Sequence, residues 1–279
     1  MSGQSRLKKL GLYLFMFLLA IFFLFPLIWM ISGSLKVETQ LYADLDKLKT
    51  FLPTPFTLDN YRNMFARTDF FRFLLNSFII TGSTILAGLV VNSLAGYALS
   101  RLEFPGRKLI DGSVLALIIV PFEAIFVPLF LIVDWMGGLD TYWALILPFV
   151  ADPFSIFLFR QFFIQIPDSV EEAAYLDGAG YWRTYLQVVV PLSKPVFATV
   201  AIWIGLNQWN RFLWPLVITS GKAKQPLSVG LREFFTNPPV NWSQILAFSS
   251  LMSIPILLLF LAFQRHFYKG VAAQAGGKG

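Results

Sequence analysis

Long runs of uncharged, apolar residues limit the fold of this chain more than any other feature. Leu10 to Ile31 is a run of 22 residues without a charged side chain. A helix of about 20 apolar residues crosses the hydrocarbon core of a bilayer and satisfies its backbone hydrogen bonds internally. Hydrophobic residues make up 56% of the sequence and charged residues only 14%, which is more apolar than a soluble domain tolerates. We therefore expect an all-α, polytopic membrane protein.

Six segments have the length and composition of transmembrane helices. They are Leu10–Ile31, Phe73–Ser100, Ser113–Val133, Trp143 to about Ile166, Val196–Ile218 and Ile245–Gln264. The third is interrupted by Pro121, Glu123 and Pro128, and the fourth carries Asp152-Pro153 near its middle. Proline cannot donate to the helical hydrogen-bond ladder, so these positions predict interruptions.

The distribution of Lys and Arg predicts which side each loop occupies. Arg6, Lys8 and Lys9 precede the first span, whereas the hairpin between Asp134 and Asp140 has no Lys or Arg. Because basic residues gather at the cytoplasmic ends of spans, both termini are expected in the cytoplasm. Residues 1–279 then form one membrane domain, with an external loop at 34–72, a cytoplasmic loop at 167–195 and a cytoplasmic tail at 265–279. The net charge of +6 has the same explanation and does not require nucleic acid.

Small and polar residues recur every four positions along the second span: Gly88, Asn92, Gly96 and Ser100. One face of that helix is therefore narrow enough for close packing against another helix. The alternative for Asn92 is a contact with the lumen of a transport path.

The stretch Ser169–Pro195 is polar and structured, yet it lies between two spans. Ser169 and Glu172 have the spacing of a capping box, which predicts a helix that starts there. Gly178 and Gly180 are natural stop points because glycine tolerates a positive φ. A second amphipathic helix follows from Tyr181 and is expected to halt near Pro191. The pattern is helix, glycine turn, helix, outside the membrane.

This stretch resembles the EAA loop of ABC importer permeases. The residues that carry the resemblance are Glu172-Ala173-Ala174, Gly178 and Val188-Val189-Val190-Pro191, in that spacing. In that family the loop forms a cytoplasmic coupling helix that docks into a groove on the ATPase subunit. The resemblance implies coupling roles for Glu172, Ala173, Ala174, Asp177, Gly178 and Pro191. The doubled acid Glu171-Glu172 is a departure, and the spacing favours Glu172 for the role of the family glutamate.

The resemblance extends over nearly the whole chain, to the carbohydrate permeases of the maltose type and to the second of their two membrane subunits. Its other matching parts include Phe56–Phe65, Ala98–Gly106, Pro128–Pro148 and Trp209-Asn210 through Pro226-Leu227. It implies a bacterial inner-membrane importer of an oligosaccharide, glycoside or polyol. The implied partners are a homologous permease, two ATPase subunits that carry ATP and Mg, and an external solute-binding protein. The tail Gln264–Gly279 is implied to touch the ATPases.

Sequence patterns of catalysis are absent. The chain has no P-loop, no H-E-x-x-H, no G-x-S-x-G and no cysteine, and its one histidine is His266. We therefore expect no catalytic residue, no metal site and no bound cofactor, with the nucleotide on another polypeptide.

Amides and flat rings alternate near the end of the fifth span. Amide side chains form hydrogen bonds with sugar hydroxyls, and indole rings pack against the apolar C–H surface of a pyranose. Asn207, Trp209, Asn210 and Trp214 are therefore candidates for the substrate path. The alternative is an aromatic belt at the membrane interface.

Two acids lie within predicted spans, Glu123 and Asp152. An ionised acid at the centre of a span costs roughly 2.5–3.5 kcal/mol, so each is expected to face a cavity or a partner. They support a rival hypothesis, an ion- or proton-coupled secondary carrier. The structural alternative is that Asp152 caps a helix that breaks at Pro153.

Overall fold

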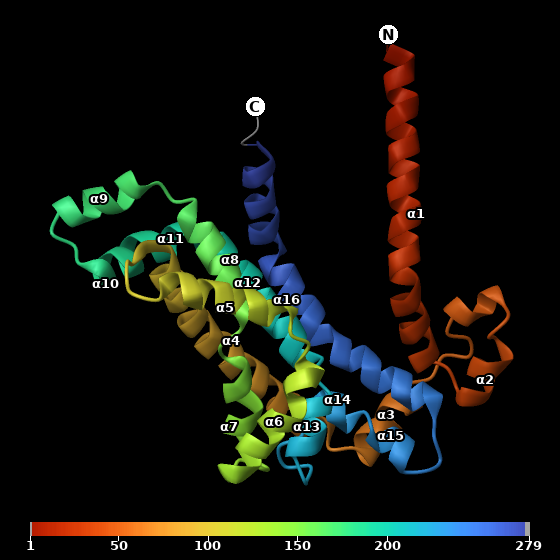
Figure 1. The fold of residues 1–279 in the computed structure, drawn as a ribbon. Helices are drawn as coiled ribbons and strands as arrows, with labels where there is room; N and C mark the ends of the chain where they lie inside the picture. Colours follow the sequence, from red (N-terminus) through yellow and green to blue (C-terminus); the bar gives the residue numbers. More distant parts are fainter. Residues whose placement is uncertain (1, 277–279) are drawn as a thin grey trace. The chain divides into compact units, whose positions relative to one another are not determined.

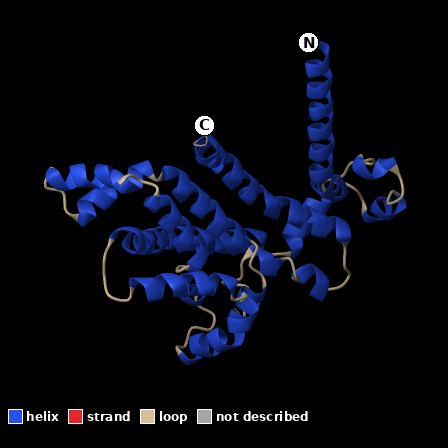
Figure 2. Ribbon diagram, turned by 45° about the horizontal axis from the view of Figure 1, so that its top comes forward, coloured by secondary structure: helices blue, strands red, loops and turns tan. Residues whose placement is uncertain are grey.

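The computed structural model describes the backbone of residues 2–276 and the side chains of residues 9–262. Within that range every regular element is a helix, and no strand forms (Figure 1 and Figure 2). The elements are α1 Ser2–Ser34, α2 Glu38–Ala43, η1 Leu48–Phe51, α3 Asp59–Arg67, α4 Phe70–Arg101, α5 Arg107–Ile119, α6 Phe122–Trp135, α7 Tyr142–Ile146, η2 Leu147–Phe149, α8 Pro153–Ile164, α9 Asp168–Leu176, α10 Tyr181–Thr184, η3 Tyr185–Val189, α11 Val190–Leu192, α12 Lys194–Trp209, α13 Leu213–Ile218, α14 Leu227–Gly230, α15 Glu233–Thr236 and α16 Trp242–Gly276. The all-α prediction is confirmed.

Three helices in the described part are long and apolar enough to cross a membrane without a break: Lys9–Ser34, Phe70–Arg101 and Trp242–Ala262. Three bent pairs pass the same test together. Arg107–Ile119 meets Phe122–Trp135 at 106°, Tyr142–Phe149 meets Pro153–Ile164 at 42°, and Tyr181–Leu192 meets Lys194–Trp209 at 79°. The total reaches the expected six spans when each pair counts as one, although Tyr181–Leu192 belongs to the loop that is expected outside the membrane.

The helix breaks follow the sequence in part. Pro121 is the N-cap of α6, and Asp152 is the N-cap of α8 immediately before Pro153, as predicted. Pro128 was expected to interrupt the third span, but it lies inside α6. One missing hydrogen bond is tolerated inside a membrane helix, because neighbouring groups and small backbone adjustments satisfy the freed carbonyl. The fifth span, expected to be continuous over Val196–Ile218, is broken between Trp209 and Leu213.

Residues 1–70 and 231–254 form one compact unit. The segment 34–72, expected as an external loop, contains the short helices α2, η1 and α3. Its centre is the fully buried Lys36, whose Nζ donates to Asp44 Oδ2 at 2.9 Å and to the carbonyl of Lys49 at 2.6 Å. Asn60 donates to the carbonyls of Ser34 and Lys36. These bonds fix the path of an otherwise irregular chain.

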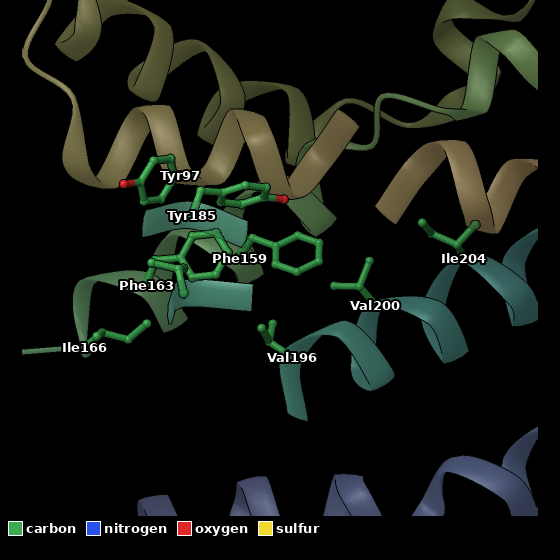
Figure 3. Close-up of a cluster of buried hydrophobic side chains, with 9 residues drawn as sticks. Tyr97, Phe159, Phe163, Ile166, Tyr185, Val196, Val200 and Ile204 are labelled. Carbon is green, nitrogen blue, oxygen red and sulfur yellow. The ribbon is translucent and has the colours of Figure 1, made fainter. Parts of the chain in front are cut away.

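Residues 71–230 and 255–279 form the second unit. Its core includes Tyr97, Phe159, Phe163, Tyr185 and Val200, contributed by α4, α8, η3 and α12 (Figure 3). The small face of α4 packs as predicted. A Cβ on Gly96 would lie 2.6 Å from Phe159 Cβ, and one on Gly88 would lie 2.8 Å from Ile204 Cδ1. Larger residues at these two positions would separate α4 from α8 and α12.

Asn92 bridges the break between α7 and α8. Its Nδ2 donates to the carbonyl of Val150 and its Oδ1 accepts from the backbone N–H of Asp152, both at 2.9 Å. A break inside a membrane exposes backbone groups that water cannot satisfy, so one buried amide supplies both partners. This is a packing contact rather than the contact with a lumen that was the alternative.

The stretch after α8 is helix, glycine turn and helix, as predicted, and it ends near Pro191 as expected, but its start differs. Helix α9 starts at Asp168 with Pro167 as N-cap, and no side chain caps it. The capping box is wrong because Ser169 is the second residue of the helix and Glu172 the fifth, not the N-cap and the third. Gly178 has φ = +79°, as expected of the turn. The second helix continues through Pro191 to Leu192, because the π-helical turn η3 widens the helix ahead of the proline ring.

Candidate functional site

A cavity of about 630 Å³ lies within the second unit. Its walls come from the α5–α6 corner, the α7–α8 break and α12. The lining is mostly apolar and aromatic, with polar side chains from Thr84, Asp152, Asn207, Gln208 and Arg211. Ligand sites in proteins combine these same features, an apolar lining and a few converging polar groups.

Asp152 holds one wall of the cavity in place. Its Oδ2 accepts from the backbone N–H of Ser155 at 2.9 Å, from the Ser155 hydroxyl at 2.5 Å and from Trp203 Nε1 at 3.1 Å. The Trp203 ring also lies against Phe154, with 4.6 Å between ring centroids. The indole is therefore fixed at both its polar and its apolar edge, and it lines the cavity.

Arg211 stands at the break between α12 and α13. Its guanidinium carbon lies 3.6 Å from the ring centroid of Phe149 and 5.0 Å from that of Phe122. Its Nε donates to Gln208 Oε1 at 3.2 Å, and Gln208 Nε2 donates to the carbonyl of Leu145 at 2.9 Å. The position of the cation is therefore set by two rings and one anchored amide.

The structure distributes the four predicted path residues unequally. Asn207 lines the cavity and donates to the carbonyl of Trp203. Asn210 is exposed at the break, but it is not part of the lining. Trp209 is buried against Phe78, and Trp214 is 0% exposed, with its Nε1 bonded to the carbonyl of Ala144. The two predicted indoles are therefore core side chains, not cavity surfaces.

The cavity residues that were not predicted from the sequence include Trp203, Gln208 and Arg211. A signal existed for two of them. Trp203 and Asn207 are four residues apart, which puts them on one face of α12. Arg211 follows after four more residues, just beyond the end of that helix. Gln208 carried no such signal.

The two acids of the carrier hypothesis do not meet in the cavity. Asp152 lines it and caps α8, as the structural alternative proposed. Glu123 is exposed in the first turn of α6 and is not part of the lining. A proton relay between these two carboxylates has no geometric basis in this unit.

A second functional region is the segment α9–α11, which we call the coupling segment (residues 168–192). Glu172, Ala173, Asp177 and Gly178 are exposed, Ala174 is half-buried, and Pro191 is exposed in α11. Beside them Leu176 is 89% exposed, and Tyr181 and Trp182 are also largely exposed. This cluster of large apolar side chains on a short polar helix pair is typical of a protein–protein contact.

Glu171, in contrast, points into the protein. It is buried, its Oε1 lies 2.7 Å from Arg101 Nε, and its Oε2 accepts from the hydroxyl of Tyr97 at 3.2 Å. Arg101 also pairs with Asp168 and donates to the carbonyl of Phe163 at 2.7 Å. The two neighbouring acids therefore differ: Glu171 is buried and anchors α9, whereas Glu172 is exposed.

Helix α4 contacts both functional regions. Asn92 binds the backbone of Asp152 at the cavity. The neighbouring Ser93 hydroxyl lies 2.6 Å from that of Tyr185 in the coupling segment. The ring of Tyr185 lies close to the ring of Tyr97 (Figure 3). The cavity wall and the coupling segment are thus joined through one helix.

Comparisons with known proteins identify the relatives of this chain. Residues 85–273 match the family described as binding-protein-dependent transport system inner membrane component. The chain is 31% identical over its whole length to the arabinooligosaccharides transport system permease protein AraQ of Bacillus subtilis, of which it covers 99%. It is 33% identical to the trehalose/maltose transport system permease protein MalG of Thermococcus litoralis, with 98% of each chain covered.

A solved structure has the same fold. It is a chain from a bacterial ABC transporter involved in the import of the acidic polysaccharide alginate, with a TM-score of 0.82. The alignment covers 96% of this chain and 99% of that one, at 23% identity.

Proposed function

Because the chain belongs to the family of binding-protein-dependent transport system inner membrane components, we propose that it is the permease subunit of an ATP-binding-cassette importer for carbohydrates. Relatives that match along their whole length are named for the transport of arabino-oligosaccharides, trehalose and maltose. The observation in this chain that supports a sugar most directly is the fixed indole of Trp203 in the cavity.

The cavity has the chemistry that a sugar requires. The Trp203 ring offers a flat apolar face, while Asp152, Asn207 and Gln208 offer hydrogen-bonding groups around it. A pyranose needs both, because its C–H face is apolar and its rim carries hydroxyls. The volume of about 630 Å³ falls in the range of small-molecule sites and accommodates a few sugar rings.

The partners follow from the mode of transport. Two ATPase subunits, which bind ATP and Mg, would dock on the coupling segments of this chain and of a homologous permease. The exposed side chains of Leu176, Tyr181 and Trp182 favour contact with an ATPase subunit. Glu172 is also exposed in the coupling segment. An external solute-binding protein would deliver the sugar. Both termini and the coupling segment would lie in the bacterial cytoplasm.

The contacts of α4 and α8 suggest how ATP drives access to the cavity. Movement of the ATPases would displace the coupling segment, which Arg101 ties to α4 and to the end of α8. The other end of α8 carries Asp152 in the cavity wall. Displacement of the coupling segment would thus rearrange the cavity, as alternating access requires.

Reconstitution tests the proposal. The chain, its partner permease, both ATPases and the loaded binding protein are placed in proteoliposomes, and uptake of a labelled oligosaccharide is measured. Uptake should require ATP on the ATPase side and cease when the ATPases carry an inactivated nucleotide site. Uptake by the isolated chain in response to a proton gradient would overturn the proposal.

A further inference from the structure

Arg211 is a cation in the cavity whose hydrogen-bonding capacity is mostly unused. A guanidinium has five N–H donors, and only the Nε–H of Arg211 has an acceptor, Gln208 Oε1. Its Nη atoms find no acceptor among the described residues, and the residue lines the cavity. The four N–H donors of the two Nη atoms are therefore available to a ligand, and two of them point in parallel from the edge between these atoms.

The guanidinium is also held in place before any ligand arrives. Its Cζ lies 3.6 Å from the ring centroid of Phe149 and 5.0 Å from that of Phe122, and both rings line the cavity. Its backbone carbonyl accepts from the Ser228 hydroxyl at 2.7 Å. A charged group held against two aromatic rings loses little conformational entropy on binding, and a desolvated cation attracts an anion more strongly than a hydrated one does.

The acid in the cavity lining already has hydrogen-bond donors from the protein. Asp152 Oδ2 accepts twice from Ser155 and once from Trp203, at the start of α8. Formally the charges of Asp152 and Arg211 sum to zero. They differ in that Asp152 Oδ2 has three donors, whereas the Nη atoms of Arg211 have no acceptor among the described residues.

We propose that Arg211 binds a carboxylate of the transported saccharide, which makes the substrate an oligosaccharide that contains uronic acid. A planar guanidinium edge pairs with a carboxylate through two parallel hydrogen bonds, a geometry that a hydroxyl cannot match. Trp203 and the amides then bind the rest of the sugar. This inference rests on the proposed carbohydrate import and specifies its substrate class.

The test compares two ligands that differ only in the carboxyl group. The complete transporter, in proteoliposomes with its binding protein, is given an oligogalacturonate of two to four residues or the methyl ester of the same oligomer. The wild type should import the acid and leave the ester. Arg211→Gln should lower uptake of the acid by about 10- to 100-fold, the value of charge-assisted hydrogen bonds, relative to its uptake of the ester.

Two further variants serve as controls. Arg232→Gln removes an exposed arginine outside the cavity and should leave the acid-to-ester ratio of the wild type unchanged. Arg211→Lys keeps the charge without the planar edge and should give an intermediate ratio. If Arg211→Gln does not assemble with the ATPases, the acid-to-ester uptake ratio of Arg211→Lys tests the inference instead.

Several results would overturn the inference. Import of neutral oligosaccharides or of the ester in place of the acid would do so while leaving carbohydrate import intact. An unchanged acid-to-ester ratio in assembled Arg211 variants would also overturn it. Failure of the complete transporter to import any saccharide, by contrast, would refute the proposed function itself.

Discussion

Arg101 Nε, at the end of α4, lies 2.7 Å from Glu171 Oε1 in α9, and the two side chains are only 12% and 6% exposed. The same guanidinium donates to the carbonyls of Phe163 and Ile166, at the end of α8. One cation therefore joins three helices where the coupling segment leaves the membrane domain. Removing one partner of a buried ion pair leaves the other uncompensated, so this contact is costly to break.

Substitutions of Glu171 and Glu172 should have different effects, because Glu171 anchors α9 to the protein and Glu172 is exposed for docking of the ATPase. Glu171→Gln loses the ion pair and should weaken attachment of α9 by about 1–3 kcal/mol, seen as faster amide hydrogen exchange across residues 168–176. Glu172→Gln is the matched control, since its side chain is exposed. It should leave exchange unchanged and lower the amount of ATPase that copurifies. Equal exchange in both variants would contradict the assignment.

Gly178 should not tolerate a β-branched residue, because its backbone has a positive φ. Its φ of +79° costs a β-branched residue about 1–2 kcal/mol, while a Cβ there would meet nothing within 4 Å. Gly178→Val should therefore reach the membrane at normal levels but bind less ATPase and lose transport. Gly178→Asn should retain more ATPase, because asparagine tolerates this conformation.

The control for Gly178 is its neighbour Gly180. It has equally open surroundings but an ordinary φ of −83°. Gly180→Val should keep more ATPase than Gly178→Val in pull-downs through a tag on this subunit. Full recovery of ATPase with normal uptake in Gly178→Val would refute the prediction.

Indoles in the cavity and in the core should behave differently when truncated. Trp203→Ala should lower sugar uptake about tenfold at normal membrane levels, because the lost stacking face belongs to the ligand site. Trp214→Ala should instead lower the amount of folded protein. Its ring is fully buried, and such truncations cost about 3–5 kcal/mol. Membrane quantification alongside uptake distinguishes the two, and normal uptake by Trp203→Ala would place the sugar elsewhere.

The pair Lys36–Asp44 should make the first unit sensitive to acid. The hydrogen bond from Lys36, followed by that from Gln40, lowers the pKa of Asp44 below its ordinary value of 3.8. A carboxylate with a lowered folded pKa contributes stability above its unfolded pKa and loses it as pH falls through the folded pKa. Proteolysis within residues 44–52 should therefore accelerate below about pH 4, near the unfolded pKa of aspartate.

Two variants check this pH dependence. Asp44→Asn removes the titrating group, so cleavage should already be fast near neutral pH and change little on acidification. Asp46→Asn alters an exposed acid two residues away and should behave as the wild type. A wild type that is equally resistant at pH 3 and pH 6 would contradict the prediction.

The helices were predictable because the length of an apolar run and the position of a proline determine the structure of nearby residues. The spans, the breaks at Pro121 and Pro153 and the positive φ of Gly178 all follow from a few neighbouring residues. The start of α9 was not predicted, because Pro167 preorganises the turn and Asp168 pairs with Arg101, which lies far away in the chain. The π-helical turn η3 ahead of Pro191 was not predicted either, because it has no sequence signature.

The cavity was only partly predictable for the same reason. Asn207 was found from local composition, but the role of Trp203 depends on Asp152, 51 residues earlier. Arg211 lies in the stretch that was singled out, yet its stacking on Phe149 depends on where η2 ends. Glu171 and Glu172 are neighbours in sequence and differ only in which side of α9 they occupy.

The amide of Asn92 also has a mechanical consequence. Because it satisfies both backbone groups at the α7–α8 break, this bend is a rigid joint and not a hinge. Helices α7, η2 and α8 must then tilt together, and within this body α8 is the lever, with Arg101 at one end and the cavity at the other. Its 12 residues span about 18 Å, so a tilt of about 10° at one end displaces the other by about 3 Å. That displacement is enough to separate Asp152 from the indole of Trp203.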